Sequence, residues 1–559
     1  MTIFRRLIII GIFVVLYSNA LFSGNYKYAY LYNKLPFQMD EVTEPIFPET
    51  KLSLCSYGGV GDGVTLNTES FKKAIEALSA KGGGKLIIPA GVWFTGPIVL
   101  KSNINLHLNK GAVILFSPDF NMYPLVRTIF EGLETRRCQS PISGVNLTNV
   151  AITGEGSING SGQAWRPLKK SKVIDSKWKE VVKSGGILKD PGYWFPSAGS
   201  LKGEEMSNMN VPRNEMTDSQ WNEVKDFMRP VMISLTECKN VKLQGVLFEN
   251  SPGWNIHPLM CENVIIDGIF ARNPAYAQNG DGLDIESCKN VLVVNSTFDV
   301  GDDGICIKSG KDKEGRERAR STENVIVDNC KVFQGHGGFV VGSEMSGSVR
   351  NISVSNCEFL GTDVGIRFKS NRGRGGVVEN IYINNIYMLN IATDSFLFDL
   401  YYGGKSASES LDDKIPGSSD MKVFPITEET PCFRNIYVKN LVSRNARRAM
   451  FFNGLPEMNI SNINLENAII TAQYGAELVE SDGVKFNNVN IIPTQGAAFI
   501  LKNVKNFSAT NLKYPVGLQH PFNINGVKTK NIMLPVTSDK KNLILCTEKI
   551  DTKEIKFLN

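Results

Sequence analysis

A short motif that recurs along the chain constrains the fold more than any other feature. It consists of an Asn, alternating branched apolar residues, a second Asn or Gly, and often a Phe. Copies begin at Asn240, Asn263, Asn290, Asn324, Asn351, Asn380, Asn435 and Asn462, and most neighbours lie 23 to 34 residues apart. Such units bury their apolar faces only by stacking. The strand-like alternation therefore predicts a single all-β parallel β-helix, with the Asn residues bonded along its turns to neighbouring backbone groups.

The segment from Tyr57 to Gly91 contains the one clear helical pattern. Phe71, Ala74, Ile75 and Leu78 follow helical spacing, Asn67 or Thr68 is placed to cap the helix, and Gly82 to Gly84 would end it. The glycine-rich start also raises the possibility of a phosphate-binding loop. It lacks the Lys-Ser/Thr pair that completes one, so a helix is favoured.

The N-terminus has the features of an export signal. Arg5 and Arg6 precede an apolar run over 7–16, and small residues follow at 18–20. We expect a signal peptide over 1–20, an extended lead-in over 21–50, the β-helix catalytic domain over 51–535 and a tail over 536–559. The mature protein would be periplasmic or secreted, without stable membrane insertion; an uncleaved membrane anchor is the alternative. Cleavage would lower the net charge from +5 to +3, which predicts no nucleic-acid partner.

Two stretches interrupt the repeat and are expected to be long loop insertions. Residues 163–230 are polar and contain four of the six tryptophans, and residues 403–431 have the composition of a surface loop. Insertions on a solenoid tend to gather on its binding face. The tryptophan rings would either stack on sugars or form a small core of the insertion itself.

The cysteines fall into columns when the repeats are aligned. Cys238, Cys261 and Cys288 each stand two residues before a motif Asn, and Cys330 and Cys357 each stand six residues after one. Buried thiols stacked inside the coil are favoured over disulfide bridges, although export would permit both.

Two acidic motifs separated by one repeat mark a candidate catalytic site. Asp281 lies in N-G-D, and Asp302 with Asp303 lies in G-D-D-G. On neighbouring coils, Asp281 and Asp302 would be roughly 5 Å apart along the stack. Crowded carboxyls cannot all ionise easily, and a neutral acid beside ionised carboxylates is what glycoside hydrolysis requires.

Basic residues follow the acids in the sequence. His336 lies in G-H-G-G, Arg367 and Lys369 lie on one face of a predicted strand, and Arg372 and Arg374 come soon after. Each is more often structural or solvated when considered alone. Together, on the coils after the acids, they would hold an anionic substrate.

In this order, N-G-D, G-D-D, G-H-G and R-F-K resemble the four signature motifs of the polygalacturonase family, glycoside hydrolase family 28. The resemblance spans about residues 53–467. It implies a right-handed, pectin-lyase-like β-helix whose N-terminal helix covers the open end of the coil, and cleavage of α-linked galacturonic acid in pectic polysaccharide or oligosaccharide with inversion and without metal or cofactor.

The resemblance also assigns roles to individual residues. Asp302 would be the general acid, and Asp281 with Asp303 would activate the water. His336 would support the protonation of the general acid. Arg367 and Lys369 would bind the sugar carboxylate, and Asn279 would position the site. Arg372 and Arg374, which follow the last motif, are expected to add to the substrate-binding residues.

The sequence departs from the family at two motif positions. Gly280 stands where Thr is usual, which could open room for another sugar, and Phe368 replaces Ile. G-S-E-M-S-G at 342–347 and the stretch from Ser251 resemble a bacterial branch that removes single galacturonic acid units from chain ends. The insertion 163–230 would enforce this mode by closing one end of the cleft.

Other functions remain open at this stage. The substrate could be rhamnogalacturonan or another branched pectin. A calcium-dependent pectate lyase and a non-catalytic glycan-binding β-helix are less favoured, because the His and Arg-x-Lys motifs fit hydrolysis better.

Overall fold

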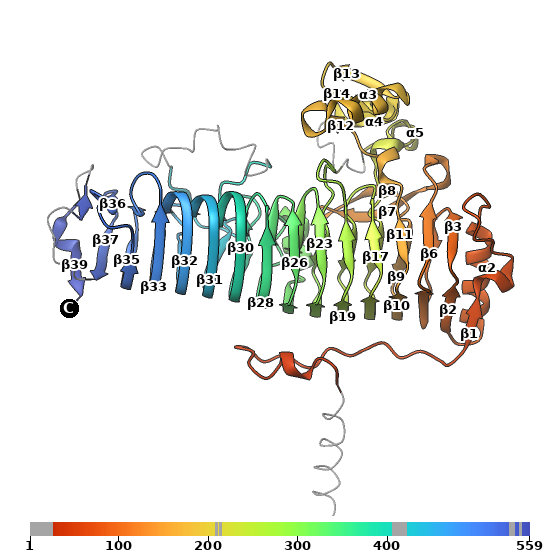
Figure 1. Cartoon of the computed structure of the whole chain (residues 1–559), viewed down its shortest axis with the longest axis horizontal. Coiled ribbons are helices and arrows are strands. Elements are labelled where there is room, and N and C mark those ends of the chain that lie inside the picture. Colours follow the sequence, from red (N-terminus) through yellow and green to blue (C-terminus); the bar gives the residue numbers. More distant parts are fainter. Residues whose placement is uncertain are drawn as a thin grey trace, which may run out of the picture.

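The computed structural model describes residues 26–206, 211, 215–404, 422–535, 543–546 and 550–558. Parallel strands stack along one axis into a long β-helix, which confirms the predicted fold (Figure 1). The expected signal peptide, 1–20, and the anchor alternative lie outside the described residues. Within the described ranges, no helix combines the length and apolarity needed to cross a membrane.

The coils place their strands in three columns, each built by parallel pairing between successive coils. The first column contains β1 (Lys51–Ser53), β2 (Gly84–Ile88), β5 (Ile104–Leu108), β10 (Thr148–Gly154), β16 (Lys239–Gln244), β19 (Glu262–Asp267), β22 (Lys289–Val294) and β25 (Thr322–Asp328). The second contains β3 (Gly91–Thr95), β6 (Ala112–Phe116), β11 (Ser157–Asn159), β17 (Leu247–Glu249), β20 (Phe270–Arg272), β23 (Thr297–Val300) and β26 (Lys331–Gln334).

The third column positions the predicted site. It contains β4 (Ile98–Val99), β9 (Ile142–Val145), β15 (Ile233–Thr236), β18 (Ile256–Leu259), β21 (Leu283–Glu286), β24 (Asp303–Lys308), β27 (Gly337–Val341) and β29 (Ile366–Lys369). The four acidic and basic motifs fall at the starts of, or within, β21, β24, β27 and β29. They therefore lie on consecutive coils.

Later coils use longer strands that bend through more than one column. These are β28 (Val349–Leu360), β30 (Val377–Asp399), β31 (Cys432–Asn453), β32 (Ile460–Val479), β33 (Ser481–Pro493) and β35 (Lys505–Lys513). The stack ends with β34 (Phe499–Lys502), β36 (Phe522–Asn525), β37 (Lys530–Pro535), β38 (Ile544–Leu545) and β39 (Ile555–Leu558).

The recurring Asn residues form ladders at the turns. Asn240, Asn263, Asn324 and Asn351 all have φ between 55° and 59°, a left-handed conformation that Asn tolerates better than most residues. Their side-chain amides bond one another across coils: the Nδ2 of Asn263 donates to Oδ1 of Asn240, and the Nδ2 of Asn351 donates to Oδ1 of Asn324. The ladder thus joins side chain to side chain, whereas the sequence predicted bonds to backbone groups.

The interior of the coil is a continuous apolar core formed by the inward side chains of all three columns. The ten cysteines are unpaired thiols, and Cys238, Cys261 and Cys288 are fully or almost fully buried on successive coils. The backbone N–H of Cys261 donates to the thiol of Cys288. The structure therefore favours the stack of buried thiols over disulfides.

The N-terminal end of the core is covered by α2 (Thr68–Ala80), which buries Phe71, Ala74, Ile75 and Leu78 as predicted. The lead-in contains a short 3-10 helix, η1 (Ala29–Leu31), and runs along the outside of the stack (Figure 1). Its Tyr28 and Val42 pack on outward side chains of the first column, including Ile265 and Leu292.

The insertion at 163–230 is a small subdomain above the coils (Figure 1). It contains η4 (Gly162–Ala164), β12 (Leu168–Lys169), η5 (Lys170–Lys172), α3 (Asp175–Lys183), β13 (Ile187–Asp190), β14 (Tyr193–Phe195), α4 (Ala198–Glu204), α5 (Asp218–Glu223) and η6 (Lys225–Phe227). All four tryptophans are buried, Trp165 and Trp221 in one cluster and Trp178 and Trp194 in another. Trp165 and Trp221 pack with Tyr123 and Cys138 from outside the insertion, and Trp178 and Trp194 pack with Leu168 inside it, so the structure decides against sugar stacking for these rings. Of the second insertion, residues 405–421 lie outside the described ranges.

Two elements near the site, a hairpin and a short helix, were not anticipated from the sequence. A hairpin joins η3 (Phe120–Met122) to β9 and consists of β7 (Leu125–Phe130) and β8 (Leu133–Cys138). A short helix, α6 (Asp312–Arg318), follows β24. Smaller 3-10 turns are η2 (Leu54–Tyr57) and η8 (Thr552–Glu554).

We expect Asn351→Ala to lower the free energy of unfolding by about 2–3 kcal/mol. Ala pays about 1–2 kcal/mol to stay left-handed and loses the ladder bonds to Asn324 and Asn380, worth about 1 kcal/mol. Asn351→Gly removes only the bonds and should cost less. Urea unfolding followed by circular dichroism measures both. Equal losses would contradict a role for backbone conformation.

Candidate active site

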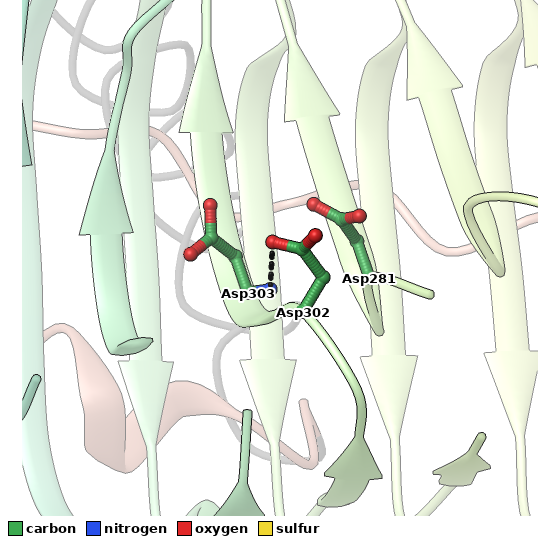
Figure 2. Close-up of side chains that lie close together, drawn as sticks. All are labelled: Asp281, Asp302 and Asp303. Atoms are coloured by element: carbon green, nitrogen blue, oxygen red, sulfur yellow. Dashed lines mark hydrogen bonds between the residues drawn. The ribbon is translucent and has the colours of Figure 1, made fainter. Parts of the chain in front are cut away.

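Three carboxylates meet where β21 and β24 begin (Figure 2). Asp281 lies two residues before β21, Asp302 directly precedes β24, and Asp303 is the first residue of β24. An oxygen from each lies within 4.8 Å of the others. The adjacent pair can share the site because the chain turns there: the backbone N–H of Asp303 donates to Oδ1 of Asp302 at 3.0 Å.

The three acids differ in their access to the surface. Asp281 is 3% exposed and the side chain of Asp303 is 1% exposed, whereas the side chain of Asp302 is 18% exposed. Asp302 is therefore the carboxyl that a ligand can touch directly. Oδ1 of Asp281 and Oδ1 of Asp303 are buried and accept no hydrogen bond from a described residue.

His336, just before β27, contacts the accessible acid. Its Nδ1 lies 3.1 Å from Oδ1 of Asp302, and its Nε2 lies 4.0 Å from Oδ2 of Asp363. Burial favours the neutral imidazole, but the charge of Asp302 outweighs it and raises the pKa of His336. Burial also disfavours ionised Asp302, yet His336, Lys369 and Arg367 together hold the pKa of Asp302 below its usual range. These two shifts together favour a single proton held by the His336–Asp302 pair.

Asp281 has the opposite environment. Burial, reinforced by the charges of Asp302, Asp284 and Asp303, raises the pKa of Asp281 well above its usual range. A carboxyl with such a pKa holds its proton more tightly than an exposed one, and once ionised it is the stronger base.

Asp303 is paired with cations from a later coil. The Nζ of Lys369 donates to its Oδ2 at 2.7 Å, and Nη1 of Arg367 lies 3.7 Å from its Oδ1. Both cations also lie against the ring of Tyr402, at 5.1 and 5.4 Å from its centroid. Arg-Phe-Lys places Arg and Lys on the cavity side and Phe368 in the core.

A second charged layer lies behind the three acids. The Nζ of Lys308 donates to Oε2 of Glu344 at 2.9 Å and lies 3.6 Å from Oδ1 of Asp284. Burial would lower the pKa of Lys308, but Cys306, Glu344 and Asp284 outweigh it and raise that pKa. Burial raises the pKa of Asp284 well above its usual range. Lys308 and Glu344 therefore form a buried ion pair in the wall of the site.

The acids open into a cavity of about 550 Å³. Its walls include residues that the sequence did not single out: Glu131 from the β7–β8 hairpin, Lys169, Glu204 and Arg229 from the insertion, Trp254, Lys311 and Tyr402. Most of these come from segments without periodicity. The sequence did predict a contribution from the insertion, because insertions on a solenoid tend to gather on its binding face, but it did not indicate which residues would reach the cavity.

The predicted substrate-binding residues divide into two groups. Asn279, Arg367, Lys369 and Arg374 line the cavity. Arg372 is not among the described lining residues, because its guanidinium binds both oxygens of Glu457, at 2.6 and 3.0 Å, and stacks on Phe424. Arg374 forms an ion pair with Asp312 at the cavity edge.

The two departures from the family motifs have packing explanations. A Cβ at Gly280 would lie 2.7 Å from the Cβ of Ala277, so the missing side chain accommodates a tight turn. Gly280 therefore does not open room for another sugar, contrary to the expectation from sequence. Phe368 packs among core rings, with its centroid 4.8 Å from that of Phe398.

The fold and site define a class: a β-helix with clustered, buried carboxylates in a basic cavity, as in enzymes that cleave acidic glycans. The family model "Glycosyl hydrolases family 28" matches residues 214–444. An exopolygalacturonase structure from Thermotoga maritima is 32% identical, with a TM-score of 0.65; the alignment covers 85% of this chain and 94% of that one.

Two curated relatives agree with these matches. A "Probable polygalacturonase" of Vitis vinifera is 28% identical over 79% of this chain and 81% of its own length. An "Exo-poly-alpha-D-galacturonosidase" of Dickeya chrysanthemi is 27% identical over 64% of this chain and 58% of its own length. The chain belongs to glycosyl hydrolase family 28 and is a glycoside hydrolase, not a pectate lyase or a non-catalytic glycan-binding module.

We expect Lys308→Met to lower the free energy of unfolding by about 3–5 kcal/mol, because it leaves buried Glu344 without its cation. The double variant Lys308→Met/Glu344→Gln should recover part of this loss. Urea denaturation of the two single variants and the double variant measures the coupling. Additive losses would mean that the pair is not energetically linked.

Proposed function

We propose that the protein hydrolyses α-linked galacturonic acid in pectin, acting on oligogalacturonides from the chain end and inverting the anomeric centre. The observation that carries the proposal is the set of three carboxylates between buried cations in one cavity. Anionic sugars suit a cavity lined by Lys308, Lys369, Arg229 and Arg367. Rhamnogalacturonan or another branched pectin is the alternative substrate.

The general acid in this mechanism is Asp302. It is the most exposed of the three carboxyls, and His336 holds a proton against it. As the glycosidic bond breaks, Asp302 delivers that proton to the leaving oxygen, and His336 keeps the pair protonated between turnovers.

The attacking water would lie between Asp281 and Asp303. Each has a buried oxygen that accepts no hydrogen bond from a described residue, and each is too buried to reach a sugar directly. Asp281 takes the proton from the water, and Asp303, which accepts a hydrogen bond from Lys369, helps to hold the water in place. Buried carboxylates that act through water favour inversion over a covalent intermediate.

The spacing of the acids bears on this choice. Inverting carboxyls usually stand about 6.5–9.5 Å apart and retaining ones about 5–5.5 Å. Here the closest oxygens lie within 4.8 Å. We give burial more weight than spacing, because a nucleophile must contact the anomeric carbon.

The proposal of attack at chain ends rests on the insertion. Residues of its η5, α4 and η6 region line the cavity on the side where β15 and β18 begin. A wall there leaves room for a short non-reducing end and not for a continuing chain. The likeness to the Thermotoga maritima exopolygalacturonase supports the same mode. A pectic substrate is in keeping with an exported protein, periplasmic or secreted.

The test is proton NMR of trigalacturonic acid digestion with a chelator present. We expect galacturonic acid monomer, released first as the β-anomer and without unsaturated ends, because inversion at an α-linkage gives β. Asp302→Asn should lower kcat about 10²–10⁴-fold, since it removes the acid.

Three outcomes would contradict parts of the proposal. First appearance of the α-anomer would indicate retention. Internal cleavage of longer oligomers, with a spread of product sizes, would exclude attack at chain ends. Cleavage of rhamnogalacturonan but not of the trimer would move the substrate to the alternative.

The pH dependence of kcat/KM should be bell-shaped. Asp281 must lose its proton to act as base, so its raised pKa sets the acid limb. The shared proton is lost as pH rises through the raised pKa of His336, which sets the alkaline limb. In His336→Asn the proton resides on a carboxyl alone, and the alkaline limb should move to lower pH. An unmoved limb would show that His336 does not hold the catalytic proton.

A further inference from the structure

We infer that Arg229 is the receptor for the carboxylate of the sugar on the non-reducing side of the scissile bond. The inference rests on the proposed function and names a specificity residue that the sequence motifs do not include. Arg229 lies at the end of the insertion, two residues after η6, and lines the cavity next to Asn279.

The guanidinium of Arg229 is 5% exposed and held by neutral acceptors. Nη1 donates to the carbonyl oxygens of Gln278 at 2.8 Å and Pro252 at 3.2 Å, and Nη2 donates to Oδ1 of Asn279 at 2.9 Å. Nε has no acceptor among the described residues. The group is thus fixed in place with donor capacity left over.

The positive charge of Arg229 also has no carboxylate at ion-pair distance within the described chain. Five other cations of the cavity already face carboxylates: Lys308 pairs with Glu344, Lys311 with Glu131, Arg367 and Lys369 with Asp303, and Arg374 with Asp312. Glu204, Glu131 and Asp281 act on Arg229 only from farther away. A buried cation without a partner is costly, and a sugar carboxylate would neutralise it.

The position of Arg229 gives the bound carboxylate a place in the substrate. Its acceptors lie in the turns before β18 and β21, on the N-terminal side of the three acids. Arg367 and Lys369 lie on β29, two strands beyond β24 and roughly 10 Å along the stack. The acids therefore lie between two cationic positions, one for the sugar on each side of the bond.

The wall formed by the insertion indicates which of the two cationic positions binds the sugar on the non-reducing side of the bond. Arg229 belongs to the end of the cavity that Glu204 and Lys169 border, where a chain attacked from its end would terminate. Arg229 would read the charge of the terminal sugar, and through Asn279 it would couple that sugar to the turn that carries Asp281. An ester at the terminal carboxyl removes the charge and should be rejected.

The experiment compares two trimers: trigalacturonic acid and the same trimer with a methyl ester on its non-reducing-end carboxyl. The wild-type enzyme should prefer the free acid by about 10–100-fold in kcat/KM, the range of a charge-assisted hydrogen-bonded pair. Arg229→Gln should cleave both trimers with similar, low kcat/KM. Arg229→Lys keeps the charge without the planar fork and should show an intermediate preference.

The matched control is Arg166→Gln. Arg166 is a buried arginine of the same insertion, bonded to the carbonyl of Ser251 and the amide of Asn250, and it is not among the described cavity residues. This variant should keep the wild-type preference even if its stability falls.

The outcomes separate this inference from the proposed function. Equal losses on both trimers in Arg229→Gln and Arg229→Lys, with circular dichroism unchanged, would overturn the inference and leave Arg229 as a positioning residue for Asn279. Failure of the wild-type enzyme on both trimers would overturn the proposed function and this inference with it.

Discussion

The in-register stacking of the third strand column is the constraint on which the site depends. Parallel pairing sets Asp303 beside Gly337 and Val340 beside Arg367, so groups far apart in sequence meet on adjacent coils. Strand pairing alone brings these groups together, without a long loop that folds back onto distant residues. A shift of one residue in any of these strands would turn the catalytic side chains into the core, because successive side chains alternate between the two faces.

The same stacking buries carboxylates, which costs free energy, and brings cations close enough to offset that cost. Asp281, Asp284 and Asp303 are almost completely buried, and burial of charge without compensation is expensive. Lys308 on β24 and Lys369 on β29 lie close enough to offset it. Both of these lysines follow the acids along the coil. Burial and the neighbouring carboxylates still hold the pKa of Asp281 well above its usual range.

The repeating part of the molecule was largely predictable from sequence, and the non-repeating part was not. The period of the Asn motif predicted the coil, and the ordered acidic and basic motifs predicted a cavity lined by Asp281, Asp302, Asp303, His336, Arg367 and Lys369. These inferences worked because a solenoid converts sequence spacing directly into spatial neighbourhood. The expectation that Gly280 opens room for another sugar was wrong, because the sequence does not show that Ala277 already fills the space beside it.

Residues outside the repeat gave no comparable signal. Arg372 is one turn beyond the R-F-K strand and is bound instead by Glu457, from a later coil that the motif order could not align with it. Glu131 and Arg229 reach the cavity through a hairpin and an insertion whose sequences lack a period. Their placement depends on packing around buried tryptophans. The composition alone did not show whether those tryptophans would be buried.

This division has a functional consequence. The coil fixes the reacting groups rigidly, because each strand is bonded on both sides, and leaves the ends of the groove undefined. The insertion borders one end of the cavity, and its tryptophans pack in two clusters that also include residues outside it, such as Tyr123, Cys138 and Tyr276. Arg229 connects the two parts, since the backbone that carries it enters β15 while its guanidinium binds the turn before Asp281. If the proposed attack at chain ends holds, bond cleavage and the choice of chain end would depend on different parts of the scaffold, the first on the coils and the second on the insertion.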